Sequence, residues 1–233
     1  MISIDTVYQK VLALANKEQR GYITPQEFNL FADQAQKEIF EQYFYDLNQF
    51  NRTPGNSEEY SDITHNLNEK ISFFEGITNV VNGVINAIDL YRLGTVIYSP
   101  NTTGVVEIEE VQQNELLYIS KAQLTKPSLK YPVYTRQTDT RIAILPIEIM
   151  TTNFVTCTYV KTPNKPSWGY SVVGNKALYD NSNTKTTNFE LHPSEESELV
   201  YKILKFAGIS MDKINIMRAG QVQEQAQVQQ EKQ

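Results

Sequence analysis

The sequence predicts an α+β fold: a helical bundle formed by the N- and C-terminal helices, with an inserted antiparallel β-rich domain. Apolar residues recur at helical spacing in the first third of the chain and again near its end. Short β-branched runs separated by turn residues fill the middle. The expected regions are an N-terminal helical region (1–89), a β-rich insertion (90–191), C-terminal helices completing the bundle (192–218) and a Gln-rich arm (219–233).

The N-terminal third carries the strongest helix signals. The spacing of apolar residues predicts a first helix over 4–17. A second helix is expected to start at Thr24-Pro25-Gln26-Glu27, where Thr24 caps the helix, Pro25 fits its first position and Glu27 completes a capping box. It is expected to continue to about residue 50, and a third helix is expected over 58–75.

The middle of the chain predicts strands. The β-branched runs cover 95–98, 105–110, 133–137, 141–145 and 154–161. A short helix is expected over 113–118. Gly174-Asn175 separates two further apolar runs and predicts a two-residue hairpin turn.

Helical pattern returns after Pro193, which suits a first helical turn. The apolar stripe Leu199, Ile203, Phe206 and Ala207 predicts a helix that ends near residue 208. The last stretch, 221–233, is dominated by Gln and has too few apolar residues to bury itself. This composition is compatible with two interpretations of the segment, a partner-binding arm and a solubilising tail.

Composition narrows the function classes. The 233 residues carry a net charge of −6 and no basic cluster, which argues against a general nucleic-acid coat. The 14 Tyr and 10 Phe suit either half-polar contact surfaces or a Tyr-rich core. No apolar run reaches the length of a membrane span, and the N-terminus lacks a signal-peptide pattern. The single cysteine, Cys157, excludes internal disulfides and suits a reducing compartment.

Residues capable of acid–base or metal chemistry are few and scattered. His65 and His192 are the only histidines, and neither stands at a metal-ligand spacing. Cys157 falls within an expected strand, which favours a small core residue over a nucleophile. No nucleotide-binding or nucleophile motif occurs. We therefore expect no catalytic, cofactor-binding or metal site, and a protein that is not an enzyme.

Two groups of residues offer sharper alternatives. Glu107, Glu109 and Glu110 fall on one expected strand. Glu107 and Glu109 alternate along it and so share one face, which favours a solvated strand face over the pair of catalytic carboxylates of a glycosidase. Lys161, Lys165 and Trp168 suggest nucleic-acid or sugar stacking, although Trp168 is better interpreted as packed against the β core.

Several stretches resemble virion structural proteins of crAss-like tailed bacteriophages. They are VYQKVLALANKEQRGYITPQEFN (7–29), LYRLG (90–94), PSWGY (166–170) and SEESELV (194–200), in that order along nearly the whole chain. The role that this resemblance implies is a ring or adaptor subunit of the head-to-tail connector. Such a subunit lies beneath the portal, links capsid to tail and provides the DNA passage.

The resemblance also implies partners. The chain would form a homo-oligomeric ring of twelve copies and bind the portal and other tail or ring proteins. Genomic DNA would pass through without specific binding, and no membrane or cofactor is involved. The subunit would be made in the host cytoplasm and reside at the head-to-tail interface of the virion. The arm residues expected to bind the portal are Gln221, Val222, Gln225, Val228 and Gln229.

Two other functions stay open at this point. One is a tail component that binds a host receptor or glycan through the β-rich region. The other is a cell-wall hydrolase that uses Glu107 or Glu109.

Overall fold

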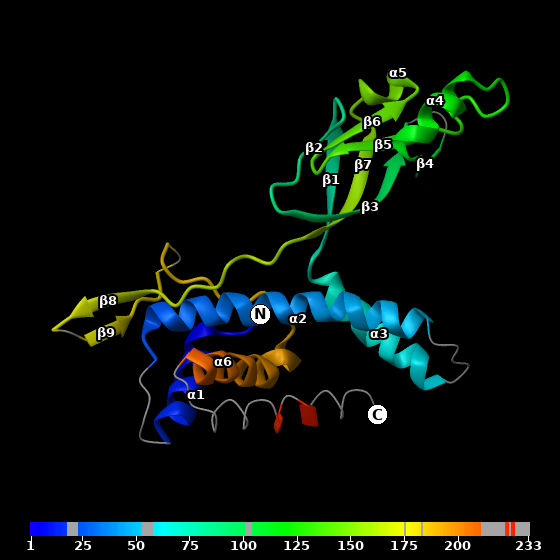
Figure 1. Ribbon diagram of the computed structural model, residues 1–233. Coiled ribbons are helices and arrows are strands. Elements are labelled where there is room, and N and C mark those ends of the chain that lie inside the picture. The colour runs from blue at the N-terminus through cyan, green and yellow to red at the C-terminus, as the bar shows by residue number, and fades with distance from the viewer. Residues whose placement is uncertain are drawn as a thin grey trace. The chain divides into compact units, whose positions relative to one another are not determined.

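A computed structural model describes residues 1–17, 23–52, 58–100, 104–174, 176–182, 184–210, 222–223 and 225–226 (Figure 1). The chain divides into two compact units, which are described separately below. One unit is Phe74–Thr162, and the other joins Met1–Phe73 to Pro163–Gln233. Their limits differ from the ranges 90–191 and 192–218 expected from the sequence.

The discontinuous unit is built on helices: α1 (Ile4–Lys17), α2 (Pro25–Arg52), α3 (Glu58–Ser72), the short 3-10 helix η1 (Pro193–Glu195) and α6 (Glu196–Ser210). The expected capping box is confirmed at the start of α2. The Thr24 backbone N–H donates to Glu27 Oε2 at 3.0 Å, and the Glu27 N–H donates to Thr24 Oγ1 at 3.3 Å. Hydrogen bonds from the Thr24 backbone, and then from its side chain, hold the pKa of Glu27 below its ordinary value.

The core of this unit lies between α1, α2 and α6. Its fully buried apolar residues come from both ends of the chain: Val7, Val11, Phe28, Ala32, Leu199 and Ile203. An isolated bridge also pairs Ile2 with Phe189. The two chain ends therefore share one hydrophobic core.

The same unit carries a β-hairpin of β8 (Tyr170–Val173) and β9 (Lys176–Tyr179). Its register runs from Tyr170 opposite Tyr179 to Val173 opposite Lys176, as expected for a tight turn at Gly174-Asn175. Gly174 has a φ of 56°, a conformation that glycine adopts without strain. The predicted hairpin is thus confirmed.

The continuous unit is a closed barrel with the strand order β1-β2-β6-β5-β4-β3-β7. Its strands are β1 (Glu75–Val81), β2 (Val84–Ile85), β3 (Leu90–Tyr98), β4 (Val106–Glu110), β5 (Val133–Thr138), β6 (Arg141–Leu145) and β7 (Val155–Lys161). All strand pairs are antiparallel except β4 and β5. The connection between those two parallel strands contains α4 (Gln113–Lys121), because parallel neighbours need a crossover. Helix α5 (Ile147–Met150) follows β6.

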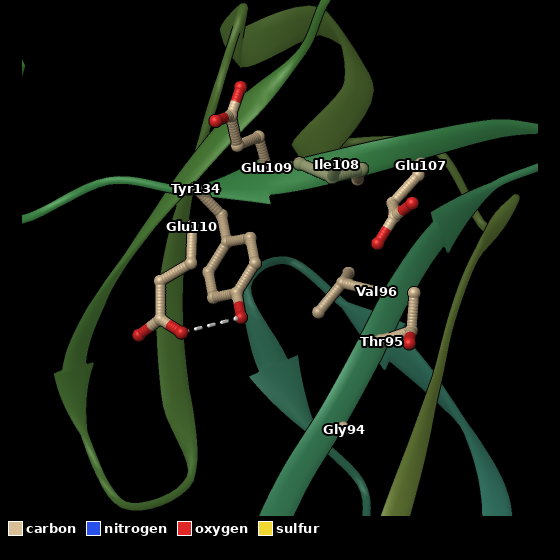
Figure 2. Close-up of a pocket in the computed structure, with 8 residues that line it drawn as sticks. All are labelled: Gly94, Thr95, Val96, Glu107, Ile108, Glu109, Glu110 and Tyr134. Atoms are coloured by element: carbon tan, nitrogen blue, oxygen red, sulfur yellow. Dashed lines mark hydrogen bonds between the residues drawn. The ribbon is translucent and has the colours of Figure 1, made fainter. Parts of the chain in front are cut away.

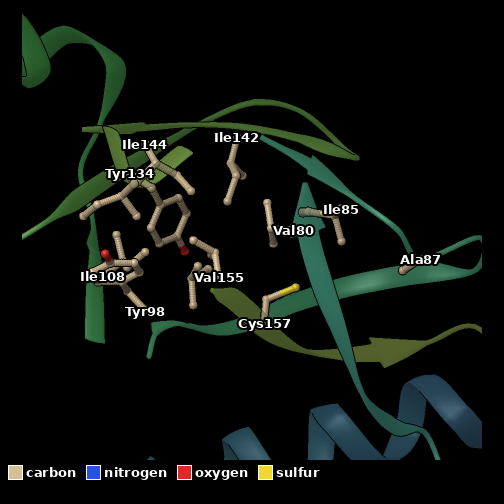
Figure 3. Close-up of a cluster of buried hydrophobic side chains, with 12 residues drawn as sticks. Val80, Ile85, Ala87, Tyr98, Ile108, Tyr134, Ile142, Ile144, Val155 and Cys157 are labelled. Atoms are coloured by element: carbon tan, nitrogen blue, oxygen red, sulfur yellow. The ribbon is translucent and has the colours of Figure 1, made fainter. Parts of the chain in front are cut away.

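Buried side chains fill the barrel (Figure 3). They include Val80, Ile85, Val96, Ile108, Tyr134, Ile142, Ile144, Ile149, Val155 and Cys157. Cys157 is 1% exposed, which confirms its interpretation as a small core residue. Burial raises the pKa of its thiol from 9.0 to about 11.

The fold class expected from the sequence is wrong. The protein is a mixed α/β structure with a closed seven-stranded barrel and, among the described residues, six α-helices, and not a helical bundle with an inserted antiparallel β domain. Strands β1 and β2 close the barrel, and neither was predicted from the sequence. The parallel β4–β5 pair also departs from an antiparallel insertion.

The signal for the missing strands is the dipeptide Asn82-Gly83 between β1 and β2. Both residues have positive φ, 52° and 76°, as a two-residue hairpin turn of this kind requires. A Cβ on Gly83 would lie 2.4 Å from the Ile142 carbonyl oxygen, so the adjacent strand also excludes a side chain here. Asn-Gly between two apolar runs is a sequence signal for a hairpin at this position.

Candidate functional site

The barrel has a cavity of about 540 Å³ over strands β3, β4 and β5 (Figure 2). Its lining residues are Gly94, Thr95, Val96, Glu107, Ile108, Glu109, Glu110 and Tyr134. A register irregularity in β3 between Leu93 and Val96 helps to shape it. There the Thr95 N–H donates to Thr158 Oγ1 at 2.8 Å, and a Cβ on Gly94 would lie 2.4 Å from that same oxygen.

The carboxylates of the three glutamates do not point toward one common position. Glu107 and Glu109 are exposed on either side of the buried Ile108, which confirms the solvated strand face expected from the sequence. Figure 2 shows the three carboxylates spread around the cavity. A glycosidase needs two carboxylates that face one bond from opposite sides. The arrangement is therefore better suited to accepting hydrogen bonds from hydroxyl groups than to hydrolysing a glycoside.

Tyr134 supplies the only phenol of this cavity lining. Its hydroxyl donates to Glu110 Oε2 at 3.2 Å. Burial, and secondarily the charge of Glu110, raises the pKa of Tyr134 to about 12. The phenol consequently stays protonated at neutral pH and holds the Glu110 side chain in place.

His192 lies beside a serine, an arrangement that could suggest an activated nucleophile. Its Nδ1 lies 2.8 Å from Ser194 Oγ and accepts from the Ser194 N–H at 3.3 Å, which makes it the cap of η1. Ser194 Oγ in turn donates to Glu195 Oε1 at 3.1 Å, and Lys70 Nζ lies 2.6 Å from that oxygen. These contacts explain the group as a helix cap joined to a buried ion pair.

His65 does not form part of a second candidate functional site. His65 is exposed on α3. Among the residues that the structure describes, no group of His, Cys, Asp or Glu could hold a metal ion. Within the same described part of the chain, no helix has the length and apolar character needed to cross a membrane.

Trp168 is buried, but its partners differ from those expected. Its indole Nε1–H donates to Asp5 Oδ1 at 2.9 Å, and its ring centroid lies 4.4 Å from that of Tyr8. The expectation that it packs against the β core is corrected: it packs on α1 and supports the hairpin. The rings of Tyr170 and Tyr179 stack on it at 5.9 and 5.6 Å. A stacking role toward sugar or nucleic acid has no free ring face to use.

The outer half of the hairpin exposes apolar side chains on both faces. Val172, Val173 and Leu178 are 66%, 59% and 51% exposed. Directly opposite residues in an antiparallel pair share a face, so Val172 and Ala177 lie on one side and Val173 and Lys176 on the other. Figure 1 shows this hairpin extending away from the helices of its own unit. We call Val172, Val173 and Leu178 the hairpin ridge.

A second apolar surface of the same unit is a groove of about 400 Å³ between α1 and α6. Its lining residues are Lys10, Ala13, Leu14, Ser197, Val200 and Tyr201, and we call it the α1–α6 groove. Lys10 Nζ lies 2.5 Å from Glu196 Oε1 at its edge. Neither surface was predicted from the sequence. The sequence signal that indicates the hairpin ridge is a pair of consecutive apolar residues in a short hairpin.

The Gln-rich arm is described at four residues only. Residues 222–223 and 225–226 are helical and exposed, and Val222 is 65% exposed. Gln221, Val228 and Gln229 lie outside the described residues. The structure thus places Val222 and Gln225 on a solvent-accessible segment.

A scan against protein-family models finds no match, and a search of curated proteins finds no significantly similar sequence.

Proposed function

We propose that the chain is a structural subunit of a bacteriophage head-to-tail connector. It forms a ring beneath the portal, links the capsid to the tail and surrounds the DNA passage. The lineage part of this proposal rests on the four segments that resemble virion proteins of crAss-like phages. The assembly part rests on the hairpin ridge, which exposes Val172 on one face and Val173 and Leu178 on the other, because exposed apolar patches mark interaction sites.

In this proposal the ring contains twelve copies, to match the symmetry of the portal. The arm over 219–233 attaches to the portal, and other tail or ring proteins bind the remaining surface. A net charge of −6 suits a wall that DNA slides past, because like charge discourages binding to phosphate. Tight binding of purified rings to duplex DNA at moderate salt would contradict this last element.

A non-enzymatic role agrees with the geometry of the two groups that resemble catalytic ones. His192 and Ser194 cap a helix, and the barrel carboxylates are spread apart. Peptidoglycan turnover by the purified chain, lost on changing Glu107 or Glu109, would overturn the structural role.

Electron microscopy of the full chain mixed with the portal protein of the same phage tests the proposal. The expected result is rings that share the symmetry of the portal and bind to it. Deletion of 221–233 should weaken attachment to the portal while circular dichroism and the unfolding midpoint stay unchanged. A monodisperse monomer that does not bind the portal protein would contradict the connector function.

The barrel cavity favours a second candidate, a tail component that binds a host receptor or glycan. Three carboxylates and one phenol around about 540 Å³ offer hydrogen-bond acceptors for sugar hydroxyls. A glycan array probed with the full chain separates the two functions. Binding that Glu107→Gln and Glu109→Gln abolish would favour the second candidate. Glu148→Gln is the matched control, since Glu148 is exposed in the same unit and does not line the cavity.

A further inference from the structure

The connection between β4 and β5 projects from the barrel. Residues 112–131 lead from β4 to β5 and include α4, and we call them the crossover segment. Every residue of this segment is described, and none is buried, although Val111 before it and Pro132 after it are. Figure 1 shows α4 and the loop that follows it extending away from the barrel strands of the same unit.

The crossover segment exposes large apolar side chains to solvent. They are Leu117, Tyr118, Leu124, Leu129 and Tyr131, and Leu124 is 99% exposed. Helix α4 has nine residues, and an isolated helix shorter than about 12–15 residues is marginal in water. A surface that covers the segment would therefore stabilise it by removing these side chains from water.

The crossover segment is basic, although the chain as a whole is acidic. It carries Lys121, Lys126 and Lys130 against one acidic residue, Glu115, whereas the whole chain has a net charge of −6. Among the described residues, none of these three lysines forms an ion pair. Lys130 Nζ instead lies 5.5 Å from the ring centroid of Tyr131. The segment thus suits an acidic partner that also accepts apolar and aromatic side chains.

The barrel cavity has the complementary charge. Three of its lining residues are glutamates, Glu107, Glu109 and Glu110, and none of the described lining residues is basic. Within the described part of the chain, these carboxylates form no ion pair. No residue of the crossover segment lines the cavity, so the segment does not cover the cavity of its own copy. One compact unit therefore carries both a basic projection and an acidic cavity.

We propose that the crossover segment of one copy docks over the barrel cavity of a second copy, with its lysines facing the three glutamates. The observation that selects this occupant is the opposite charge of two surfaces that every copy carries. The contact joins unlike surfaces, so a copy that gives its segment to one neighbour receives a segment from another. This inference deepens the proposed function and rests on it for the requirement that the contacts close into a ring.

The length and local order of the crossover segment suit a specific contact. Residues 112–131 match the scale of one side of a standard interface, about 20–30 residues. Ser128 and Tyr131 close a turn: the Ser128 N–H donates to the Tyr131 carbonyl at 3.2 Å, and the Tyr131 N–H donates to the Ser128 carbonyl at 3.1 Å. The turn holds Leu129 and Lys130 in place before docking, so less conformational freedom is lost on binding.

Zero-length cross-linking of the native full chain tests the contact. Unlabelled and isotope-labelled chains are mixed before assembly and treated with a carbodiimide, which joins a touching lysine and carboxylate as an amide with loss of water. Mass spectrometry should find lysines of the crossover segment joined to glutamates of the cavity, in pairs that combine a light with a heavy peptide. Pairs of one isotope only would place the contact within a single copy and overturn the proposal.

Charge exchange provides a second, independent measurement. Lys126→Glu/Lys130→Glu should weaken self-association by about tenfold or more in sedimentation experiments, because attractions between the two surfaces become repulsions. Glu107→Lys/Glu109→Lys should have the same effect. A chain that carries all four changes again presents opposite charges to its neighbour, so it should recover the association of the native chain.

Two matched variants control for the change of charge alone. Glu148→Lys reverses an exposed carboxylate of the same unit that does not line the cavity. Lys165→Glu reverses an exposed lysine outside the crossover segment. Both should keep the association of the native chain. An unchanged circular dichroism spectrum in every variant separates lost association from lost folding.

Several outcomes would overturn the inference. They are the absence of mixed-isotope pairs, charge reversals without effect, a folded four-change chain that fails to associate, and lysines of the segment that are protected by anionic vesicles and not by assembly. Portal-bound rings without these cross-links would refute this contact and leave the proposed function standing. A closed two-copy assembly with the cross-links would support the contact and contradict the connector ring. Absence of any self-association would refute both.

Discussion

The two units manage exposed strand edges in opposite ways. In the barrel unit, Phe74–Thr162, seven strands close on themselves, so every strand has a neighbour on both sides. In the helical unit, β8 and β9 form a two-stranded sheet. Closure removes edges that could recruit another chain, whereas an open hairpin keeps them. The barrel therefore leaves no open strand edge, while the hairpin of the helical unit leaves edges at which another chain could pair.

Each unit contains a reporter that the chain has only once. Trp168 is the single tryptophan and lies in the helical unit, and Cys157 is the single cysteine and lies in the barrel core. Tryptophan fluorescence therefore follows unfolding of one unit, and pulsed thiol labelling follows the other. The two signals allow the comparison to be tested unit by unit.

The largest effect is expected from Phe28→Ala in the helical unit. Phe28 is fully buried, and its ring lies 4.7 Å from that of Tyr8. The lost transfer free energy and the cavity should reduce the free energy of unfolding by about 3–5 kcal/mol. In a urea titration, the fluorescence midpoint should fall markedly and the thiol-labelling midpoint much less. Equal shifts of both midpoints would show that the units do not unfold separately.

Ile142→Ala should produce the reverse pattern. Ile142 is 1% exposed inside the barrel, and removing its side chain should cost about 2–5 kcal/mol. Cys157 should then become labelled at a lower urea concentration, with little change in the fluorescence of Trp168. Ile88→Ala is the control in the same unit, because Ile88 is 98% exposed and its truncation should leave both midpoints in place.

The barrel should also lose stability in alkali. The pKa of Tyr134 is raised from 10.0 to about 12 and that of Cys157 from 9.0 to about 11. Groups with raised folded-state pKa values stabilise fully below the unfolded values, and their contribution is lost as pH rises through the folded values. The thiol-labelling midpoint in urea should therefore fall between about pH 9 and pH 12. In the Tyr134→Phe variant, the urea midpoint should fall less in the upper part of this pH range. If the variant and the native chain show the same pH dependence, the raised pKa of Tyr134 does not contribute to stability.

The smallest effect is expected from the cap of α2. Thr24→Ala removes the hydroxyl that accepts from the Glu27 N–H and should cost about 1 kcal/mol. The pKa of Glu27 is lowered in the folded state from its ordinary value of 4.5, so its contribution is present above that value and is lost as pH falls through the folded value. Fluorescence-detected unfolding should show this acid sensitivity in the native chain and less of it in the variant. An identical acid dependence in both proteins would refute the role of the cap.

Elements that depend on residues close together in the sequence were predicted correctly. The errors concern strands that pair with distant parts of the chain. The Thr24 capping box and the hairpin at Gly174 depend on residues within a few positions of one another, so both were predicted correctly. Barrel closure depends on pairs such as Ile77 with Thr158, which no local pattern reveals. The Asn82-Gly83 turn was visible and would have predicted the first two strands.

The candidate surfaces were harder to predict than the elements that carry them. The α1–α6 groove joins Leu14 to Val200, residues that only the folded core brings together. The barrel cavity likewise joins Glu110 to Tyr134 through the parallel β4–β5 pair. Sequence alone identified Glu107 and Glu109 as a solvated pair, and it predicted the function class through resemblance and not through a site.

A ring subunit requires that the helical unit of one copy be completed by another copy of the chain. The mass of the full chain in solution, measured by light scattering over a wide range of protein concentration, tests it most directly. We expect one closed oligomer of fixed size, which Val173→Asp converts to monomer with an unchanged circular dichroism spectrum. A native chain that stays monomeric at every concentration, or a Val173→Asp variant that keeps the same oligomer, would contradict it.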